Sequence, residues 1–313
     1  MNKSTRIILP GAAGLVGQNL IVLLKEKGYH NIVAIDKHPA NIAILKSLHP
    51  DITVIENDLA VDNDWQESVT QGSVVVMLQA QIGAKDAAPF YRNNIESTRR
   101  VLEISEKHQV EYLVHISSSV VESVGDDDYT KTKKEQEQMV AKTTLPHCIL
   151  RPTLMFGWFD RKHLGWLSRF MQKVPVFPIP GSGKYMRQPL YVRDFCHIII
   201  ACLEQQPDRN VYNITGKEEI DYIDIIRQIK QAIHSNTVIV RIPYSLFWIL
   251  LTIYALFDKD PPFTTSQLKA LTAGDEFELI PWWDIFNVMP TPLETAFEET
   301  FNHPTYSKVI LDF

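Results

Sequence analysis

Cysteine is scarce in this sequence, and the few copies exclude two kinds of protein. Cys148, Cys196 and Cys202 are the three cysteines among 313 residues, and they stand in apolar surroundings without metal-ligand spacing. This pattern is typical of buried free thiols in a reducing compartment, not of a disulfide framework or a metal centre. The N-terminus also lacks the basic and then apolar residues of a secretion signal, so we expect a cytoplasmic protein.

Long basic tracts are absent as well. The net charge is −6, and no block of Lys and Arg is large enough to cover a face of the protein, so we expect no nucleic-acid partner. With 45% hydrophobic and 22% charged residues, the composition is that of a soluble globular protein. A length of 313 residues favours two domains over one.

One apolar run stands out, residues 244–257, but it is shorter than the ~20 residues that a membrane-spanning helix needs. We expect no transmembrane segment and a helix buried in the core, because a helix that is apolar all round is usually buried. Two alternatives stay open. Residues 248–257 would serve as an apolar lid over a lipid-like substrate, or the run would contact a membrane surface.

A glycine-rich turn near the N-terminus predicts a dinucleotide site. Gly11, Gly14 and Gly17 lie between a predicted buried strand, residues 6–10, and a predicted helix, residues 15–27. Glycines at this spacing allow a tight turn, close approach to a pyrophosphate, and close packing of helix on strand, while the helix N-terminus offers N–H donors to phosphates. The alternative is a turn whose glycines serve only the backbone.

A carboxylate follows at the position where such a site holds a ribose. Asp36 ends the next predicted strand, residues 31–36, about 20 residues beyond the last glycine. A carboxylate repels a 2′-phosphate, so NAD is favoured over NADP, and Lys37 and His38 directly after it soften this preference. The alternative interpretation of Asp36 is an ordinary turn residue at the end of a strand.

The alternation of strands and helices predicts the fold class. Further strands are expected at residues 52–56, 73–79, 112–117 and 147–151, and helices at 89–108 and 129–142. This order predicts βαβ units and an α/β fold with a doubly wound parallel Rossmann sheet. Right-handed crossovers then bring every carboxyl strand end to one rim, where the ligand crevice forms.

The second half of the chain changes in composition. Residues 174–183 are rich in proline and glycine and predict a loop. A second alternation follows, with strands at 190–192 and 211–214 and helices at 194–203 and 221–233. We predict an NAD-binding domain over residues 1–172, with returning elements near 189–216, and a smaller, mainly substrate-binding domain over residues 173–313.

Serines at a strand end and a Tyr-x-x-x-Lys pair predict proton transfer. Ser117, Ser118 and Ser119 end the strand at 112–117, and Tyr129 and Lys133 follow. A tyrosine and a lysine four residues apart on a helix project from one face, so the ammonium favours the phenolate. Such a pair is suited to taking a proton from an alcohol. The alternative is a half-buried tyrosine beside a solvated lysine.

On these residues, the chain resembles the extended short-chain dehydrogenase/reductase family, over most of residues 5–216. The likeness is greatest to its NAD-dependent epimerase/dehydratase branch, of the UDP-galactose 4-epimerase type. The glycines and Asp36 match the cofactor fingerprint of that family. Ser118, Tyr129 and Lys133 match its catalytic residues, and Asn94 matches the asparagine that supports the active site.

The resemblance implies which residues bind NAD and which bind substrate. The implied NAD contacts are Gly11, Ala13, Gly14, Leu15, Val16, Gly17, Asp36, Lys37, Asp58, Leu59, Gln79, Ala80, Gln81, Asn94, Ser117, Tyr129, Lys133, Pro152, Thr153 and Leu154. The implied substrate contacts are Ser118, Ser119, Arg187 and Tyr191. Arg187 is the candidate for a substrate phosphate, because a guanidinium offers a bidentate fork to oxyanions; a surface arginine is the alternative.

Several positions depart from the family pattern. Ser118 and Tyr129 are closer in sequence than in most members, and Glu122 and Ser123 replace the usual Tyr-Gly. The Thr-Asp-Glu triplet of the 4,6-dehydratases and the late Arg-x-Gly-Asp element are absent. Residues 126–128 are three aspartates just before Tyr129, which we expect to form a solvated acidic loop because burying unpaired carboxylates is costly.

The resemblance implies NAD-dependent hydride transfer at a secondary alcohol, foremost that of a nucleotide sugar. Tyr129 would act as the base, Ser118 would bond the same oxygen, Lys133 would hold the nicotinamide ribose, and Asn94 would position Lys133 or a water. These groups serve an epimerase and a net dehydrogenase equally. The alternatives are a reductase or dehydrogenase of a lipid-like or lipid-linked alcohol, and a non-catalytic NAD-binding assembly subunit. A homodimer through the helices at 89–108 and 129–142 is also implied.

Overall fold

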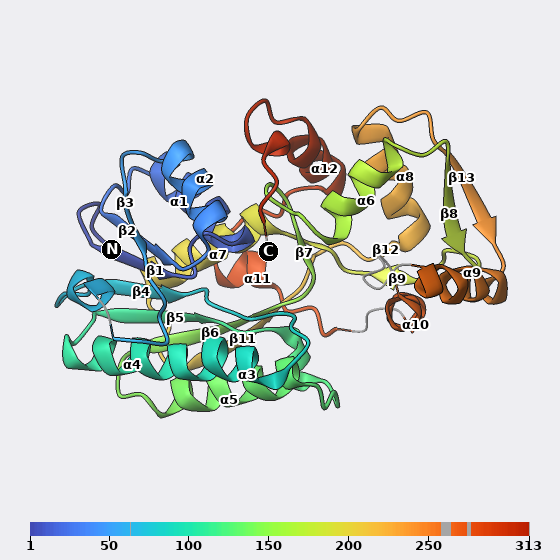
Figure 1. Cartoon of the computed structure of the whole chain (residues 1–313). Helices are drawn as coiled ribbons and strands as arrows, with labels where there is room; N and C mark the ends of the chain where they lie inside the picture. Colours follow the sequence, from blue (N-terminus) through green and yellow to red (C-terminus); the bar gives the residue numbers. More distant parts are fainter. Residues whose placement is uncertain (63, 258–263, 274–276, 313) are drawn as a thin grey trace.

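The chain folds around a seven-stranded parallel sheet with the strand order β11-β6-β5-β4-β1-β2-β3 (Figure 1). The computed structural model describes residues 1–62, 64–257, 264–273 and 277–312. The sheet strands are β1 Ile7–Pro10, β2 Ile32–Asp36, β3 Thr53–Glu56, β4 Val74–Met77, β5 Tyr112–Ile116, β6 His147–Pro152 and β11 Asn210–Ile214. Every pairing in this sheet is parallel, which confirms the predicted Rossmann fold.

Helices cover both faces of the sheet because its strands are apolar on both sides. Ile7 and Leu9 of β1 pack towards one face, and Ile8 between them packs towards the other. The first face is covered by α1 Leu15–Glu26, α2 Pro39–Leu48 and α7 Val192–Gln205, and the second by α4 Ser97–Lys107 and α5 Asp128–Lys142. Strands that are buried on both faces are the expected form of a parallel sheet.

The helix predicted at residues 89–108 contains an irregularity that the sequence pattern does not reveal. It begins as α3 Ala87–Phe90, widens into a π-helical segment over Tyr91–Glu96, and continues as α4. A π-helical turn inside a helix is frequent at functional sites, because it shifts the side chains that follow. Asn94 lies in this turn.

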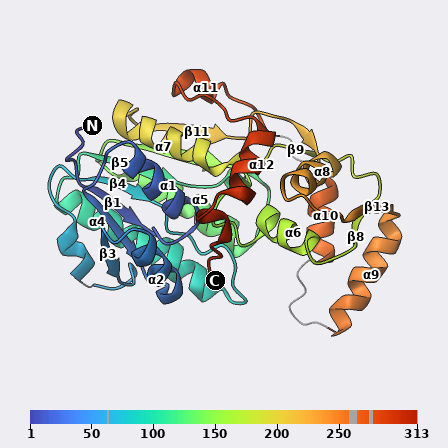
Figure 2. The ribbon, with the colours of Figure 1, turned by 90° about the horizontal axis from the view of Figure 1, so that it is seen from above.

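A second region is built beside the sheet from the later part of the chain (Figures 1 and 2). Its buried centre lies among α6, α8 and α12. Its elements are β7 Met155–Phe156, α6 His163–Met171, β8 Val176–Pro180, β9 Met186–Arg187, β10 Leu190–Tyr191, β12 Ile220–Asp221, α8 Tyr222–Ala232, β13 Val238–Ile242, α9 Tyr244–Phe257, α10 Thr265–Ala273 and α12 Leu293–Asn302. The loop predicted over residues 174–183 is wrong in part, since β8 pairs in parallel with β13. Within the described ranges, β8 pairs with β13 alone, so no second strand lacks the N–H that its prolines do not have.

Parts of the later chain return to the sheet. β11 extends the sheet beside β6, and α7 packs on α1. The short helix α11, Trp282–Ile285, also returns, and the indole of Trp282 donates to the carbonyl of Thr215 at 2.9 Å. Leu311 near the C-terminus packs against Val22 of α1. The predicted division at residue 173 therefore does not separate two continuous pieces in space.

Helix α9 departs most from expectation. The predicted core helix is exposed: Trp248 is 45% exposed, Leu250 50% and Leu256 79%. Both views place α9 at the end of the molecule away from the seven-stranded sheet (Figures 1 and 2). The prediction of a core helix is therefore wrong, because the chain places little of its own surface over this helix. Among the described residues, no helix has the length and apolarity needed to cross a membrane.

Candidate functional site

The glycine-rich turn after β1 has the shape that its sequence predicts. Gly11 has a positive φ of 81°, and a Cβ there would lie 2.5 Å from the backbone nitrogen of Gln79. A Cβ on Gly17 would lie 2.3 Å from the carbonyl oxygen of Ala12. Both glycines are therefore required by the protein itself, through a left-handed turn and through close packing of α1 on β1.

Gly14 is different and bears on the cofactor. A Cβ on Gly14 would meet only the carbonyl oxygen of Gly11, at an ordinary 3.7 Å. No described atom of the protein therefore demands glycine here, whereas a pyrophosphate lying against the turn would. Gly14 also caps the N-terminus of α1 without any side-chain hydrogen bond, which leaves the first N–H groups of a 12-residue helix to an anion. Leu15 and Val16 form the start of this helix, so the local geometry fits a dinucleotide.

The carboxylate of Asp36 lies against the glycine-rich turn. It accepts hydrogen bonds from the backbone nitrogens of Ala13 at 2.9 Å and Lys37 at 2.8 Å. The Lys37 ammonium in turn lies 3.7 Å from Asp58. The structure thus brings together three separate strand ends, those of β1, β2 and β3, as the predicted cofactor rim requires.

Asp58 is held in its charged form next to this rim. Burial opposes the charge, but the amide of Ala60 and the guanidinium of Arg92, at 2.8 Å, lower the pKa of this carboxyl below its usual value. Leu59 beside it is 7% exposed. The Asp58–Leu59 pair thus places a charged carboxylate beside the rim and an apolar side chain in the core.

Asn94 ties the loop after β4 to the helix that carries the tyrosine. Its Oδ1 accepts from the backbone nitrogen of Gln81 at 2.6 Å, and its Nδ2 donates to the Thr132 hydroxyl at 2.9 Å. Because Asn94 is fully buried, it acts as a positioning residue. It reaches the neighbour of Lys133 and not Lys133 itself, which sharpens the role predicted for it. The loop it holds, with Gln79 and Ala80, passes the proposed cofactor rim.

Ser118, Tyr129 and Lys133 converge at the carboxyl end of β5. Lys133 is 1% exposed, and its Nζ donates to the carbonyl of Ile116, the last residue of β5, at 3.0 Å. The Ser118 side chain lies close to the phenol of Tyr129. Tyr129 and Lys133 are one turn apart on α5. The three predicted side chains therefore occupy one place on the rim.

The phenol is less acidic than the sequence suggests. Burial raises the pKa of Tyr129 above its usual value, the Ser118 hydroxyl acts in the opposite direction, and the negative charge of Asp127 raises the pKa further. The charge of Lys133 therefore does not dominate this phenol. The prediction that Lys133 makes the phenolate accessible finds no support in this geometry, because the ammonium is bound to a backbone carbonyl.

The lysine is perturbed as well. Burial lowers the pKa of Lys133 from 10.5 to about 7, against the smaller opposing effect of Glu137. A buried amine with a pKa near neutrality, at the end of a sheet strand, is typical of a functional site.

The acidic loop is exposed, as predicted, but it also has a structural task. Asp126 pairs with Lys131 at 2.9 Å on the surface. Asp127 caps the N-terminus of α5 and accepts from the backbone nitrogen and hydroxyl of Thr130, at 2.9 and 2.8 Å. Such a cap fixes the start of the helix that carries Tyr129.

A partly buried ion pair that the sequence motifs do not indicate holds the same helix. Arg151 of β6 makes two parallel bonds to Glu137 of α5, at 2.9 and 2.7 Å, and a third to Glu122 at 2.5 Å. Glu122 stands where the family usually has tyrosine, so this departure adds an anchor. Glu137 lies eight residues after Tyr129 on α5. This spacing places both residues near one helix face, and it is the feature of the sequence that indicates the role of Glu137.

The remaining predicted cofactor and serine positions lie along the same rim. Ser117 is 5% exposed, and Ser119 starts the short turn after the serine strand. Pro152 ends β6, and Thr153 bonds through its backbone nitrogen to the carbonyl of Ile214 at 3.0 Å. Leu154 beside them is 43% exposed, so its side chain is the one free to meet a ligand.

Arg187 and Tyr191, the two predicted substrate residues in the second region, differ in their surroundings. Arg187 of β9 donates to the backbone carbonyl of Leu271 in α10, so its guanidinium lies under that helix. Tyr191 is 3% exposed, and its ring packs on Phe156 with 5.5 Å between ring centroids. Its hydroxyl lies near Glu299. This burial argues against the predicted contact of Tyr191 with substrate and indicates a core residue.

Fold and rim together define a dinucleotide-binding α/β protein of the Rossmann type. The family model described as "NAD dependent epimerase/dehydratase family" matches residues 7–215. The chain belongs to this family. The predicted family and its dependence on NAD are thereby confirmed.

Individual relatives are distant but cover most of the chain. The chain is 24% identical to the UDP-N-acetyl-alpha-D-glucosaminuronate decarboxylase of Bacillus cytotoxicus, over 76% of this chain and 84% of that protein. It is 24% identical to the N-acetyl-alpha-D-glucosaminyl-diphospho-ditrans,octacis-undecaprenol 4-epimerase of Escherichia coli O157:H7, over 77% and 76%. The solved structure of UDP-glucuronic acid 4-epimerase from Bacillus cereus in complex with NAD has a TM-score of 0.69 at 22% identity and covers 96% of both chains.

Proposed function

We propose that this chain is an NAD-dependent enzyme that oxidises a secondary alcohol of a nucleotide sugar and returns the hydride, as a sugar epimerase does. The observation that carries the proposal is the convergence of Ser118, Tyr129 and Lys133 at the end of β5. The names of both curated relatives contain a sugar joined to a diphosphate. This likeness supports the same substrate class here.

The cofactor is proposed to lie along the rim from the glycine-rich turn to β5. Gly14 and the N-terminus of α1 would hold the pyrophosphate, Asp36 a ribose hydroxyl, and the loop of Gln79, Ala80 and Gln81 would pass beside it. Bound NAD supplies the hydride acceptor. The carboxylate of Asp36 favours NAD over NADP, because a 2′-phosphate would lie against a negative charge.

Tyr129 is proposed to take the proton of the substrate hydroxyl, while Ser118 hydrogen-bonds the same oxygen. The phenol must first ionise, and its raised pKa keeps it protonated at pH 7. We therefore expect the oxidation step to become faster as the pH rises above 7. Lys133 is proposed to hold the cofactor ribose and, through the backbone of Ile116, the strand end that carries the serines.

The substrate anion is assigned to Arg187, whose guanidinium is fixed by the carbonyl of Leu271. A sugar diphosphate joined to a lipid is the second candidate substrate. Two observations favour it: one relative bears the name of such an epimerase, and the exposed helix α9 contacts α10, the helix that lies over Arg187.

Turnover of a panel of UDP-sugars and undecaprenyl-linked sugars tests the proposal, with NADH absorbance and sugar configuration followed together. Appearance of the epimer without net NADH is the expected result. Tyr129→Phe should lower the rate by about 10²–10⁴-fold with little change in NAD affinity. Tyr306→Phe is the matched control, since this ring packs far from β5 against Trp158.

Two outcomes would contradict this function. If Tyr129→Phe turns over as fast as the unchanged chain, the phenol is not the base. If the chain binds NAD and turns over no sugar of either class, the result supports the alternative of a non-catalytic NAD-binding subunit. A cytoplasmic homodimer through α4 and α5 belongs to the same proposal, and light scattering that gives a monomer would remove it.

A further inference from the structure

Helix α9 directs an apolar stripe away from the protein. The side chains of Leu246, Ile249, Leu250 and Ile253 are 45–50% exposed. Their spacing of three and four residues places them on one face of the helix. Such a stripe normally faces the core of a globular protein. Here the less exposed residues of α9 are Phe247 and Leu251, which lie to one side of the stripe.

The rest of α9 has the character of an interfacial helix. Its 14 residues include no Asp, Glu, Lys or Arg. The Thr252 hydroxyl is satisfied inside the helix, because it donates to the carbonyl of Trp248 at 2.9 Å. Trp248 and Tyr244 are 45% and 40% exposed, and such amphipathic rings gather where membrane meets water. With a length of about 21 Å, the helix is short of the ~30 Å hydrocarbon layer, so it suits lying in the surface plane.

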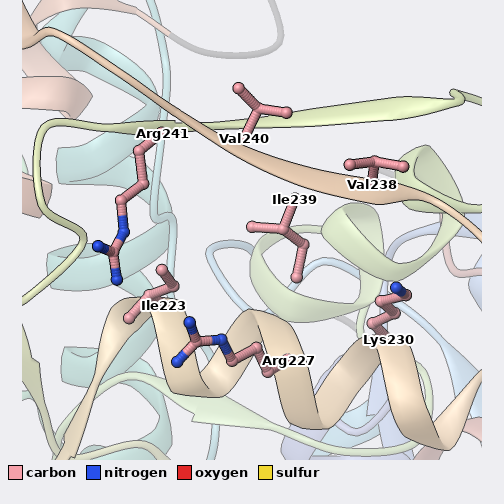
Figure 3. Close-up of a pocket in the computed structure, with 7 residues that line it drawn as sticks. All are labelled: Ile223, Arg227, Lys230, Val238, Ile239, Val240 and Arg241. Carbon is pink, nitrogen blue, oxygen red and sulfur yellow. The ribbon is translucent and has the colours of Figure 1, made fainter.

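A cationic groove opens beside the start of this helix. It has a volume of about 650 Å³ and lies between β13 and α8. Figure 3 shows the guanidinium groups of Arg227 and Arg241 projecting into the same space, with Lys230 further along α8. Asp224 neutralises Arg227 at 2.7 Å. Lys230 and Arg241 make no ion pair with a residue of the described ranges, so the groove is positive in a chain of net charge −6.

The groove and the helix are adjacent along the chain. Arg241 and Ile242 end β13, and α9 follows after Pro243 alone. Exposed valines lie on the two-stranded ribbon of β8 and β13, on the face of β13 opposite to Arg241 (Figure 3): Val176 is 47% exposed, Val238 57% and Val240 39%. Cations next to a large exposed apolar face are the combination that binds an anionic lipid surface.

We infer that α9 and the adjoining groove dock the protein on a bilayer that carries anionic phospholipids. The outer stripe of α9 enters the boundary between headgroups and acyl chains, and Arg241 and Lys230 meet lipid phosphates. This inference does not depend on the reaction at β5. It also explains why the apolar side chains of α9 are exposed, because their transfer from water into the acyl layer is favourable.

The charges favour lipid over a second copy of the chain. A twofold dimer would place the same patch opposite itself, and the unpaired cations would then face their own kind. A phospholipid surface offers the opposite charge together with an apolar layer. Self-association through α9 is therefore an outcome that the experiment must separate.

Flotation of the full chain with vesicles tests the inference. The two vesicle types are pure phosphatidylcholine, and phosphatidylcholine with about 30% phosphatidylglycerol. We expect roughly tenfold stronger partition to the anionic vesicles, falling when salt is raised to about 0.5 M. The double variant Leu250→Asp, Ile253→Asp should lose roughly tenfold or more of this partition. Lys230→Gln with Arg241→Gln should remove only the preference for anionic lipid.

The matched control places the same charges on apolar side chains elsewhere. Met289→Asp with Ile310→Asp changes residues that are 90% and 51% exposed and lie outside α9, and it should float like the unchanged chain. Unchanged thermal melting of each variant checks the fold. Equal flotation of the α9 variant and the unchanged chain would overturn the inference. The inference would also be overturned if the unchanged chain did not float with either type of vesicle. A dimer of the unchanged chain in sedimentation that the α9 variant disrupts would then assign α9 to self-association.

Discussion

The central strands of the sheet and helix α9 are both rich in aliphatic side chains, yet the central strands bury these side chains and α9 exposes them. In β1 and β4, every residue is buried. In α9, Leu250 is 50% and Leu256 79% exposed. The difference lies in what covers each element. In a parallel sheet, the helices that connect the strands cover both faces. A helix at the periphery of the molecule is covered only if another segment packs against it.

Polar groups show the reverse contrast. Around β5 the buried polar groups Lys133, Asn94 and Glu137 are held by specific partners. In α9 the helix has no charged group at all. The polar groups around β5 are therefore paired inside the protein, whereas the apolar side chains of α9 remain exposed.

The largest effect is expected in the glycine-rich turn of the sheet region. Gly17→Ala would place a Cβ 2.3 Å from the carbonyl oxygen of Ala12, and neither backbone can move cheaply. We expect the free energy of unfolding to fall by about 3 kcal/mol. Gly14→Ala, with its contact of 3.7 Å, should cost less than about 1 kcal/mol but weaken NAD binding. Denaturant titration and NAD calorimetry measure the two effects. Equal destabilisation by both variants would refute this division of roles.

The features that the sequence predicts well are those set by local chemistry. Alternating strands and helices predict the sheet, and the glycines and Asp36 predict the turn and the carboxylate that the structure places side by side. The motif residues Ser118, Tyr129 and Lys133 meet because parallel strands share a rim. Each of these inferences needs only spacing and the geometry of regular elements.

The features that the sequence does not predict depend on tertiary packing between separate elements. An apolar run such as α9 has the same pattern whether it is covered or exposed, so periodicity could not place it. The raised pKa of Tyr129 arises from burial and the Asp127 charge, which spacing alone does not give. Tyr191 looks like a substrate residue by motif but is covered by Phe156. The ion pair of Arg151 joins residues from separate elements.

A smaller effect is expected from Lys133, and its sign depends on pH. The pKa of this amine is about 7 in the folded chain and 10.5 when exposed, so the unfolded chain binds more protons between those values. The free energy of unfolding of the NAD-free chain should therefore rise with pH across this window. Lys133→Met should abolish that rise and, at pH 6, stabilise the chain by roughly 1–3 kcal/mol while activity is lost.

The control for this pH effect is Lys134→Met. The Lys134 ammonium is at the surface and donates to the carbonyl of Ser123 at 2.9 Å. Its removal should leave the pH dependence of unfolding unchanged. Thermal melts of the three proteins from pH 6 to pH 10 give the comparison. Parallel curves for Lys133→Met and the unchanged chain would mean that the buried amine is not titrating.

The smallest effect is expected on α9, and it sharpens the contrast with the sheet region most directly. Ile249→Gln replaces a side chain that is 47% exposed, and glutamine is a good helix former, so the free energy of unfolding should change by less than about 0.5 kcal/mol. The same substitution at Ile198 of α7, which is fully buried, should cost about 3 kcal/mol or more, because a core contact is lost and an amide is buried. Denaturant titration of both variants decides the matter. If the free energy of unfolding falls nearly as much for the Ile249 variant as for the Ile198 variant, α9 is covered in solution by another copy of the chain. The two regions would then not differ in how they bury their apolar side chains.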